Sequence, residues 1–183
     1  MTKDFWAGLD KATAGDAILT GYTGEFEDMP VYTDVISLVG DGKSALDFGC
    51  GVGRNTRALS KTFKSVMGFD LPNMIAIVPH TNRGERIEYS SDWHNIKTLK
   101  FDVVLASLVF QHIEESELES YVFDISKMTN KLVMHSRTWI DHTETQVLPI
   151  VEKYFTIETI VHQKDPNGNS NDHFIAVLNS KAE

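Results

Sequence analysis

The sequence predicts an α/β fold in which helices cover both faces of a mostly parallel sheet. Short apolar runs alternate with stretches of helical spacing, which is the pattern of repeated strand, helix and strand units. A glycine-rich turn follows the first run, and the chain closes with two segments in which apolar and polar residues alternate. We therefore expect one domain over residues 1–183, with a parallel sheet that ends in an antiparallel hairpin.

The first 43 residues precede the opening strand and differ from the rest. Two segments are compatible with helices, DFWAGLDKA and PVYTDVISLVG, and TGYTGEFEDM between them reads as a loop. In the second segment Pro30 suits a first helical turn and Gly40 suits the helix end. The region is rich in aromatic residues, so it either packs on the sheet edge or forms a helical lid over a ligand site; these aromatics are Phe5, Trp6, Tyr22 and Tyr32.

Residues 44–183 carry the alternating elements of the core. Helical spacing occurs over 56–63 and 116–128, between apolar runs that read as buried strands. These runs are SALDFG, SVMGFD, RIEYS, FDVVLASLVF and KLVMHS.

The last part of the chain predicts a helix and a hairpin. FTIETIVHQ and HFIAVLNS alternate apolar with polar residues on either side of KDPNGNSND, which is rich in turn-forming residues. Two antiparallel strands are the natural interpretation. One face of the preceding helix is marked by Val147, Ile150, Val151 and Tyr154.

Composition restricts the classes of function. A net charge of −9 argues against an extended surface that follows nucleic-acid phosphates, and one cysteine with seven scattered histidines offers no zinc-ligand spacing, so no metal is expected. No run approaches the roughly 20 apolar residues of a membrane span, and the start MTKDFWAGLD lacks the features of a signal peptide. We expect a cytoplasmic protein that contacts no membrane.

The segment LDFGCGVGRNT, residues 46–56, predicts a ligand site at the turn from the first strand to its helix. In open α/β sheets ligands bind beyond the carboxyl ends of the strands. Gly49 and Gly51 lack side chains that would hold a ligand away, and the following helix offers a positive N-terminal end. A dinucleotide fingerprint from Gly49 requires Gly or Ala where this chain has Arg54, and the frame two residues later meets Thr56. The spacing disfavours a dinucleotide.

LDFGCGVG followed by VMGFDLPNMI resembles the class I S-adenosylmethionine-dependent methyltransferases of the small-molecule type. The similarity extends from Ser44 to the terminal hairpin. It implies a Rossmann-like seven-stranded sheet of order 3-2-1-4-5-7-6 with strand 7 antiparallel. It also implies S-adenosylmethionine as the cofactor and S-adenosylhomocysteine as the product.

The resemblance assigns roles to residues after each of the first four strands. Asp70, 21 residues after Gly49, would accept the ribose hydroxyls, Asp92 and Trp93 would contact the adenine, and a backbone carbonyl near Ser107 would meet the ammonium group. Asp47 would help to hold the amino-acid end, directly or through water. The full set of expected cofactor-binding residues is Asp47, Gly49, Cys50, Gly51, Arg54, Asn55, Asp70, Leu71, Met74, Asp92, Trp93, Ser107 and Leu108.

Catalytic candidates follow the fourth and fifth strands. His112, in LVFQHIEE, lies where the family faces the transferred methyl group, and a histidine is able to act as a base near neutral pH. The alternative is a structural histidine, because many small-molecule members carry a similar segment. A second group would line the acceptor pocket or serve only as surface or core residues; it comprises His135, Trp139, Asp141 and His142.

The absence of certain sequence motifs restricts the class of methyl acceptor. Cytosine C5 methylation requires a cysteine nucleophile outside the cofactor loop, whereas the single cysteine, Cys50, lies inside it. The Asn/Asp-Pro-Pro-Tyr/Phe element of amino-methylating DNA enzymes is absent. We expect methyl transfer to an oxygen or nitrogen atom of a small molecule, by a monomer or homodimer and with nucleic acid disfavoured. The alternatives are a non-catalytic cofactor-binding partner and a protein methyltransferase.

Overall fold

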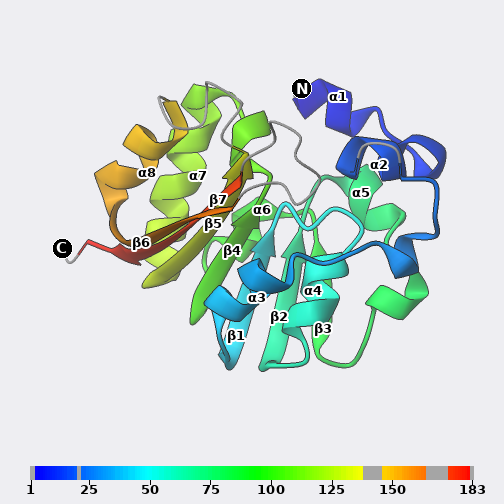
Figure 1. Cartoon of the computed structure of the whole chain (residues 1–183), viewed down its shortest axis with the longest axis horizontal. Coiled ribbons are helices and arrows are strands. Elements are labelled where there is room, and N and C mark those ends of the chain that lie inside the picture. The colour runs from blue at the N-terminus through cyan, green and yellow to red at the C-terminus, as the bar shows by residue number, and fades with distance from the viewer. Residues whose placement is uncertain (1–2, 20–21, 138–145, 164–172, 182–183) are drawn as a thin grey trace.

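The computed structural model describes residues 3–19, 22–137, 146–163 and 173–181. Across these residues, seven strands form one sheet in the order β3-β2-β1-β4-β5-β7-β6 (Figure 1). Strands β1 to β5 pair in parallel, and β7 is antiparallel to both β5 and β6. This topology confirms the fold class and the strand order that the resemblance implies.

The elements follow the alternation expected from the sequence. The strands are β1 (Gly42–Phe48), β2 (Phe63–Phe69), β3 (Ile87–Ser90), β4 (Val103–Ser107), β5 (Lys131–Arg137), β6 (Phe155–Gln163) and β7 (His173–Ser180). The helices are α1 (Lys3–Ala7), α2 (Lys11–Ile18), α3 (Thr33–Val39), α4 (Arg54–Leu59), α5 (Pro72–Ala76), α6 (Trp93–Ile96), α7 (Glu115–Met128) and α8 (Leu148–Tyr154), with 3₁₀ turns at Phe26–Asp28, His80–Asn82 and Phe110–His112. Within this part of the chain no helix combines the length and apolar composition that a bilayer crossing requires.

Alternate residues of the central strands pack into two hydrophobic cores, one on each face of the sheet. Val104 and Ala106 of β4 belong to the core under α7 and α8, whereas Val103 and Leu105 pack with α3 and α4 on the other face. Figure 1 shows the two helical layers on opposite sides of the sheet. Because side chains alternate along a strand, a continuous apolar run is what a strand buried on both faces requires.

The carboxyl ends of β1, β2 and β4 meet at one edge of the sheet. Phe48, the last residue of β1, pairs with Phe69 of β2 and with Ala106 of β4. The loops that leave these three strands therefore start side by side. The N-terminal helices α1 and α2 and helix α5 lie at this edge (Figure 1).

Three expected element boundaries are wrong. The strand expected over 101–110 ends at Ser107, because Leu108 takes a φ of 58°, which extended backbone does not allow. The helix expected over 56–63 is α4 (Arg54–Leu59), and Phe63 already begins β2. Pro30 precedes α3 instead of lying in its first turn. Apolar spacing does not reveal these ends.

Leu118 of α7 and Leu99 provide a matched test of the core. Leu118 is 1% exposed within the core under α7, and Leu99 is 43% exposed. Leu118→Ala should lower the free energy of unfolding by about 2–5 kcal/mol because it leaves a cavity, whereas Leu99→Ala should cost less than about 1 kcal/mol. Urea denaturation of both variants measures this difference, and equal losses would contradict the assigned core.

Candidate functional site

The loop after β1 adopts a left-handed conformation at every second residue. Gly49, Gly51 and Gly53 have φ values of 74°, 56° and 81°. The backbone N–H groups of Gly49 and Cys50 both donate to the carbonyl oxygen of Phe69, at 2.8 and 3.0 Å. These bonds fix the loop on the end of β2.

The three glycines meet different requirements. A Cβ atom at Gly49 would lie 2.3 Å from the Val109 side chain, and one at Gly53 would lie 2.3 Å from the Tyr89 hydroxyl oxygen. A Cβ atom at Gly51 would meet no atom closer than 3.6 Å. Close packing of the protein therefore explains two of the glycines, whereas a Cβ atom at Gly51 would make only an ordinary contact with Ile18, and Gly51 lines the cavity described below.

Two polar residues that the sequence did not indicate, Asn82 and Tyr89, support the loop by hydrogen bonds. The Tyr89 hydroxyl donates to the carbonyl oxygen of Asn82 at 2.7 Å, and the Asn82 amide donates to the carbonyl oxygen of Val52 at 2.7 Å. Asn82 is fully buried. These bonds hold the loop through residues that lie 30 or more positions later in the chain.

Asp70 follows β2 and faces the same loop. Its Oδ2 atom accepts the N–H of Gly51 at 2.7 Å, and its Oδ1 atom accepts the N–H of Leu71 at 2.7 Å. Burial raises the pKa of the Asp70 carboxyl group above its ordinary value, and the two backbone bonds oppose that rise. Each oxygen keeps a further lone pair, so the carboxylate is still able to accept hydroxyl groups.

A cavity of about 390 Å³ opens beside the loop and Asp70. Eleven expected site residues line it: Gly49, Cys50, Gly51, Arg54, Asn55, Asp70, Leu71, Met74, Ser107, Leu108 and His112. Lining residues that the sequence analysis did not assign to the site include Trp6, Ile18, Phe69, Gln111, Tyr121 and Arg137. The cavity therefore gathers most of the expected residues, together with side chains to which the sequence analysis assigned no role in the site.

Asp47 lies behind the loop and does not line the cavity. It is 1% exposed, its Oδ2 atom accepts the Thr56 hydroxyl at 2.6 Å, and its Oδ1 atom has no partner among the described residues. Burial raises its pKa to about 7, and the nearby charge of Asp70 adds to the rise. The expected role of Asp47 toward the amino-acid end of the cofactor stays a prediction.

Asp92 and Trp93 also lie outside the cavity. The Asp92 carboxylate is exposed and caps α6, where it accepts the backbone N–H of Asn95 at 3.2 Å and its side-chain amide at 2.6 Å. The Trp93 ring packs edge-on against Phe48, and its N–H donates to Asp124 at 3.0 Å. The structure does not bring these two residues to the cavity, and their expected contact with adenine stays a prediction.

Arg54 and Asn55 open α4 and are both buried against the cavity. The Arg54 guanidinium donates to the carbonyl oxygen of Pro30 at 2.8 Å and lies over the Tyr32 ring, 5.2 Å from its centre. Arg54 therefore ties the N-terminal segment to the cavity wall, as well as facing the cavity itself.

The end of β4 is anchored by the adjacent strand. The N–H of Leu108, in the left-handed region, donates to the carbonyl oxygen of His135 at 2.8 Å, and the Ser107 hydroxyl lies 3.0 Å from His135 Nδ1. His135 Nε2 in turn lies 2.8 Å from His173 Nδ1. Burial lowers the pKa of His135 to about 3, so its ring is neutral at pH 7.

His135 is therefore a buried support for Ser107 and is not part of the cavity lining. The other members of its expected group, Trp139, Asp141 and His142, lie outside the described residues. Within the described ranges, no group of three or more His, Cys, Asp or Glu side chains is placed to hold a metal ion.

His112 lies in the cavity wall, and its neighbours define its protonation. The Gln111 Oε1 atom accepts both the Ser136 hydroxyl at 3.0 Å and the Arg137 backbone N–H at 3.2 Å. The Gln111 amide nitrogen then points at His112 Nε2, 3.1 Å away, and donates to it. Burial lowers the pKa of His112 to about 4. The neutral ring therefore carries its proton on Nδ1.

The N-terminal helix α1 spans the cavity between α5 and α7. The Asn73 side chain of α5 donates to the carbonyl oxygens of Trp6 and Leu9, at 2.8 and 3.0 Å. At the other end Lys3 pairs with Glu117 of α7 at 3.0 Å, in a half-exposed position where such pairs contribute little. Residues of α1 and α2 line the cavity, and a lid function for residues 1–43 stays a prediction.

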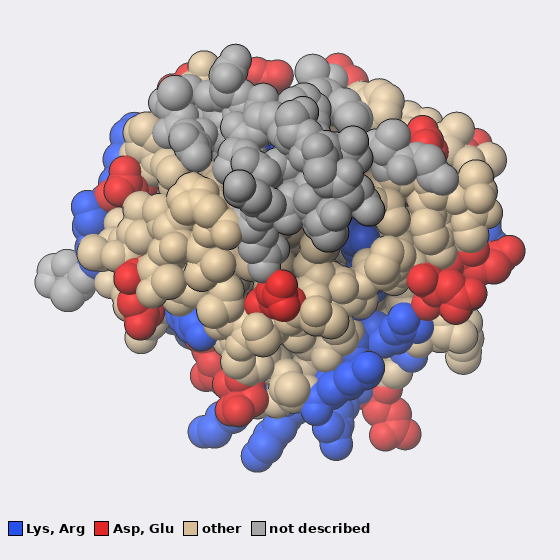
Figure 2. All heavy atoms as spheres, viewed as in Figure 1, with Lys and Arg blue, Asp and Glu red and all other residues tan. Residues whose placement is uncertain are grey.

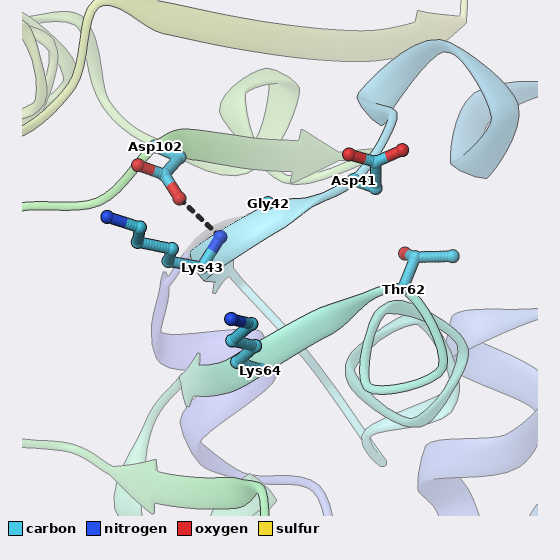
Figure 3. A pocket seen from close by; sticks show the side chains of 6 residues that line it. All are labelled: Asp41, Gly42, Lys43, Thr62, Lys64 and Asp102. Atoms are coloured by element: carbon cyan, nitrogen blue, oxygen red, sulfur yellow. Dashed lines mark hydrogen bonds between the residues drawn. The ribbon is translucent and has the colours of Figure 1, made fainter.

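A second hollow lies at the opposite edge of the sheet, where β1 and β2 begin. It is lined by Asp41, Gly42, Lys43, Thr62, Lys64 and Asp102 (Figure 3). The Asp102 carboxylate accepts the backbone N–H groups of Lys43 and Ser44, at 2.6 and 3.0 Å, so it fixes the start of β1. Figure 2 shows Lys and Arg side chains along the lower edge of the molecule. The expected site residues lie in neither place.

Comparison with known proteins agrees with this arrangement. Residues 46–131 match a family described as a methyltransferase domain. The structure is similar to the N-methyltransferase NodS from Bradyrhizobium japonicum WM9 in complex with S-adenosyl-L-homocysteine, with a TM-score of 0.68, 18% identity, and coverage of 82% of this chain and 85% of that one. A comparison with curated proteins gives no match.

Two further solved structures are similar over most of the chain. One is a TehB-like SAM-dependent methyltransferase from Corynebacterium glutamicum ATCC 13032 Kitasato, with a TM-score of 0.66, 20% identity, and coverage of 84% of this chain and 90% of that one. The other is the PH0226 protein from Pyrococcus horikoshii OT3, with a TM-score of 0.67, 16% identity, and coverage of 99% and 100%. At these identities the similarity shows the fold.

The raised pKa of Asp47 has a consequence for stability. The folded protein holds this proton up to about pH 7, whereas the unfolded chain releases it near pH 4. Stability from this group is therefore present at low pH and is lost as the pH rises between these values, by at most about 1.4 kcal/mol per pH unit. Asp47→Asn should remove this dependence.

Urea denaturation of the ligand-free protein at pH 5 and pH 8 checks the expectation. The free energy of unfolding of the wild type, taken relative to Asp47→Asn, should fall by about 1–3 kcal/mol between the two pH values. Parallel pH dependence in the two proteins would show that the buried carboxyl group is not protonated in the folded state.

Proposed function

The chain belongs to the class I S-adenosylmethionine-dependent methyltransferases, and we propose that it transfers the methyl group to an oxygen or nitrogen atom of a small molecule. The observation that carries the small-molecule proposal is the cavity. Its volume of about 390 Å³ lies within the range of pockets that enclose small ligands. Helices α1 and α2 contribute to its wall, whereas a protein acceptor requires an open groove.

The residues around the cavity fit the cofactor. Asp70 presents acceptor oxygens for ribose hydroxyls, and Leu71 and Met74 beside it offer apolar surface for the adenine. Gly51 lines the cavity without a side chain, which lets a ligand approach its backbone closely. Backbone carbonyl oxygens near Leu108, at the end of β4, would accept from the ammonium group. These residues would supply partners for the ribose, the adenine ring and the ammonium group of S-adenosylmethionine.

Positioning is the main task that remains for the protein. S-adenosylmethionine supplies a methyl group that its sulfonium sulfur already activates. Alignment of an acceptor lone pair with the methyl carbon then accounts for much of the rate, since well-oriented pairs reach effective molarities on the order of 10⁵ M or more. Fixed elements surround the acceptor end, including the 3₁₀ turn Phe110–His112 and the end of β5.

His112 belongs to this positioning wall, and its Nδ1 carries a proton that has no acceptor among the described residues. Its Nε2 lone pair is already occupied by Gln111. This arrangement favours an acceptor atom that has a free lone pair at neutral pH, such as an amine nitrogen or an ionised oxygen. NodS, one of the similar structures, is an N-methyltransferase, which supports nitrogen as one of the two candidate atoms.

Asp70→Asn tests the cofactor site. Loss of the charged acceptor should weaken S-adenosylhomocysteine binding about 10- to 100-fold, because hydrogen bonds to a charged group contribute about 1.5–3 kcal/mol. Calorimetric titration measures the affinity, and thermal unfolding shows whether the variant is folded. Asp41→Asn, an exposed carboxylate in the hollow at the opposite edge, is the control and should bind like the wild type. Unchanged affinity in folded Asp70→Asn would place the ribose elsewhere.

Label transfer tests the reaction itself. Protein and methyl-labelled S-adenosylmethionine are incubated with a size-fractionated cell extract, with Asp70→Asn in parallel. We expect label in the low-mass fraction that depends on the wild-type Asp70. Label in protein or nucleic acid would overturn the proposed acceptor class. No transfer by a protein that binds the cofactor would favour a non-catalytic binding partner.

A further inference from the structure

Among the described residues, three N–H groups of side chains that line the cavity have no hydrogen-bond partner. They are the indole N–H of Trp6, Nδ1 of His112 and Nε of Arg137, and all three atoms are buried. His112 belongs in this set because its Nε2 atom accepts from Gln111, which leaves the proton on Nδ1. A buried donor without a partner costs about 1–3 kcal/mol, so three in one cavity indicate a bound acceptor group.

The three donors lie together at the end of the cavity over β4 and β5. The Trp6 ring packs against the His112 ring, with centres 5.2 Å apart. The Arg137 backbone N–H and the His112 ring are held by the two ends of the same Gln111 amide. The charge of Arg137 is a minor cause of the lowered pKa of His112, and burial is the largest. These contacts join the Trp6 ring and the Arg137 backbone to His112.

This end is distinct from the part of the cavity beside Asp70. Asp70 follows β2, and Arg137 ends β5, with β1 and β4 between these strands. Three strand spacings separate the two positions, which is about 14 Å. Gly51, Leu71 and Met74 gather at the Asp70 end. The cofactor groups assigned above occupy the region from β2 to β4, and the three donors lie beyond it.

Arg137 brings a positive charge to this end of the cavity. Lys3 is paired with Glu117, and the Arg54 guanidinium donates to Pro30 and stacks on Tyr32. Among the described residues, the Arg137 guanidinium has no ion pair or hydrogen bond. A cation with two neutral donors beside it matches a group that carries negative charge on oxygen.

We propose that the methyl acceptor carries a carboxylate and that Arg137, His112 and Trp6 hold it by hydrogen bonds. The inference rests on the proposed function, because it names the class of the acceptor for the same site. A carboxylate takes several hydrogen bonds at once and balances the Arg137 charge. The three side chains then act in acceptor binding and specificity.

Binding of small acids and their neutral amides to the protein saturated with S-adenosylhomocysteine tests the proposal. The probes are benzoate with benzamide and acetate with acetamide, titrated by ligand-observed NMR. We expect at least one acid to bind tenfold or more tightly than its amide. Arg137→Gln should abolish this preference, and Trp6→Phe, which keeps the ring and removes the N–H, should weaken the acid about fivefold. Lys64→Gln at the opposite edge is the control and should behave like the wild type.

Two results would overturn the proposal. The first is an absence of acid preference in the wild-type complex for both pairs. The second is a loss of S-adenosylhomocysteine affinity in Arg137→Gln with unchanged binding of 5′-methylthioadenosine, which lacks the amino-acid end, since the donors would then hold the cofactor's own carboxylate. If the wild type binds no S-adenosylhomocysteine, the proposed function itself is wrong.

Discussion

The site depends on the attachment of one glycine loop to the end of one neighbouring strand. Two consecutive N–H groups of the loop donate to the carbonyl oxygen of Phe69, and a third, from Gly51, donates to the carboxylate of the next residue, Asp70. Parallel pairing of β1 with β2 places Phe48 beside Phe69. The loop that follows Phe48 therefore starts close to the Phe69 carbonyl oxygen and the Asp70 carboxylate that accept its N–H groups. The same bonds that shape the loop also hold Asp70 at the cavity.

Much of the fold, and the part of the site expected to bind the cofactor, could be predicted from local sequence pattern. Apolar runs, helical spacing and the terminal hairpin give the sheet class, and the glycine loop with Asp70 gives the cofactor end. Local pattern does not show what a glycine packs against: Gly49 meets Val109, 60 residues away in the sequence. It also extends β4 too far, because Leu108 is as apolar as a strand residue and yet takes a left-handed φ.

The proposed acceptor end of the cavity could not be predicted because it is assembled from segments that are far apart in the chain. Asn73 and the Lys3–Glu117 pair hold α1, which carries Trp6, and the pairing of β5 with β4 brings Arg137 to the same edge. Gln111 is an ordinary polar residue in sequence, but its amide oxygen takes two donors and so fixes the direction of its nitrogen. The orientation of this amide depends on three partners at once, and no periodic pattern in the sequence indicates it.

The role of His112 follows from that fixed amide. A histidine near the reacting group suggests a general base, since its ordinary pKa is close to neutral. Here burial lowers the pKa to about 4, and Gln111 occupies the one lone pair of the neutral ring. Proton removal would require the ring to break the bond to Gln111 and to become charged in a buried place beside Arg137. Both changes are unfavourable, so the geometry suits a histidine that donates a hydrogen bond to an acceptor whose methyl-accepting atom is already free of its proton.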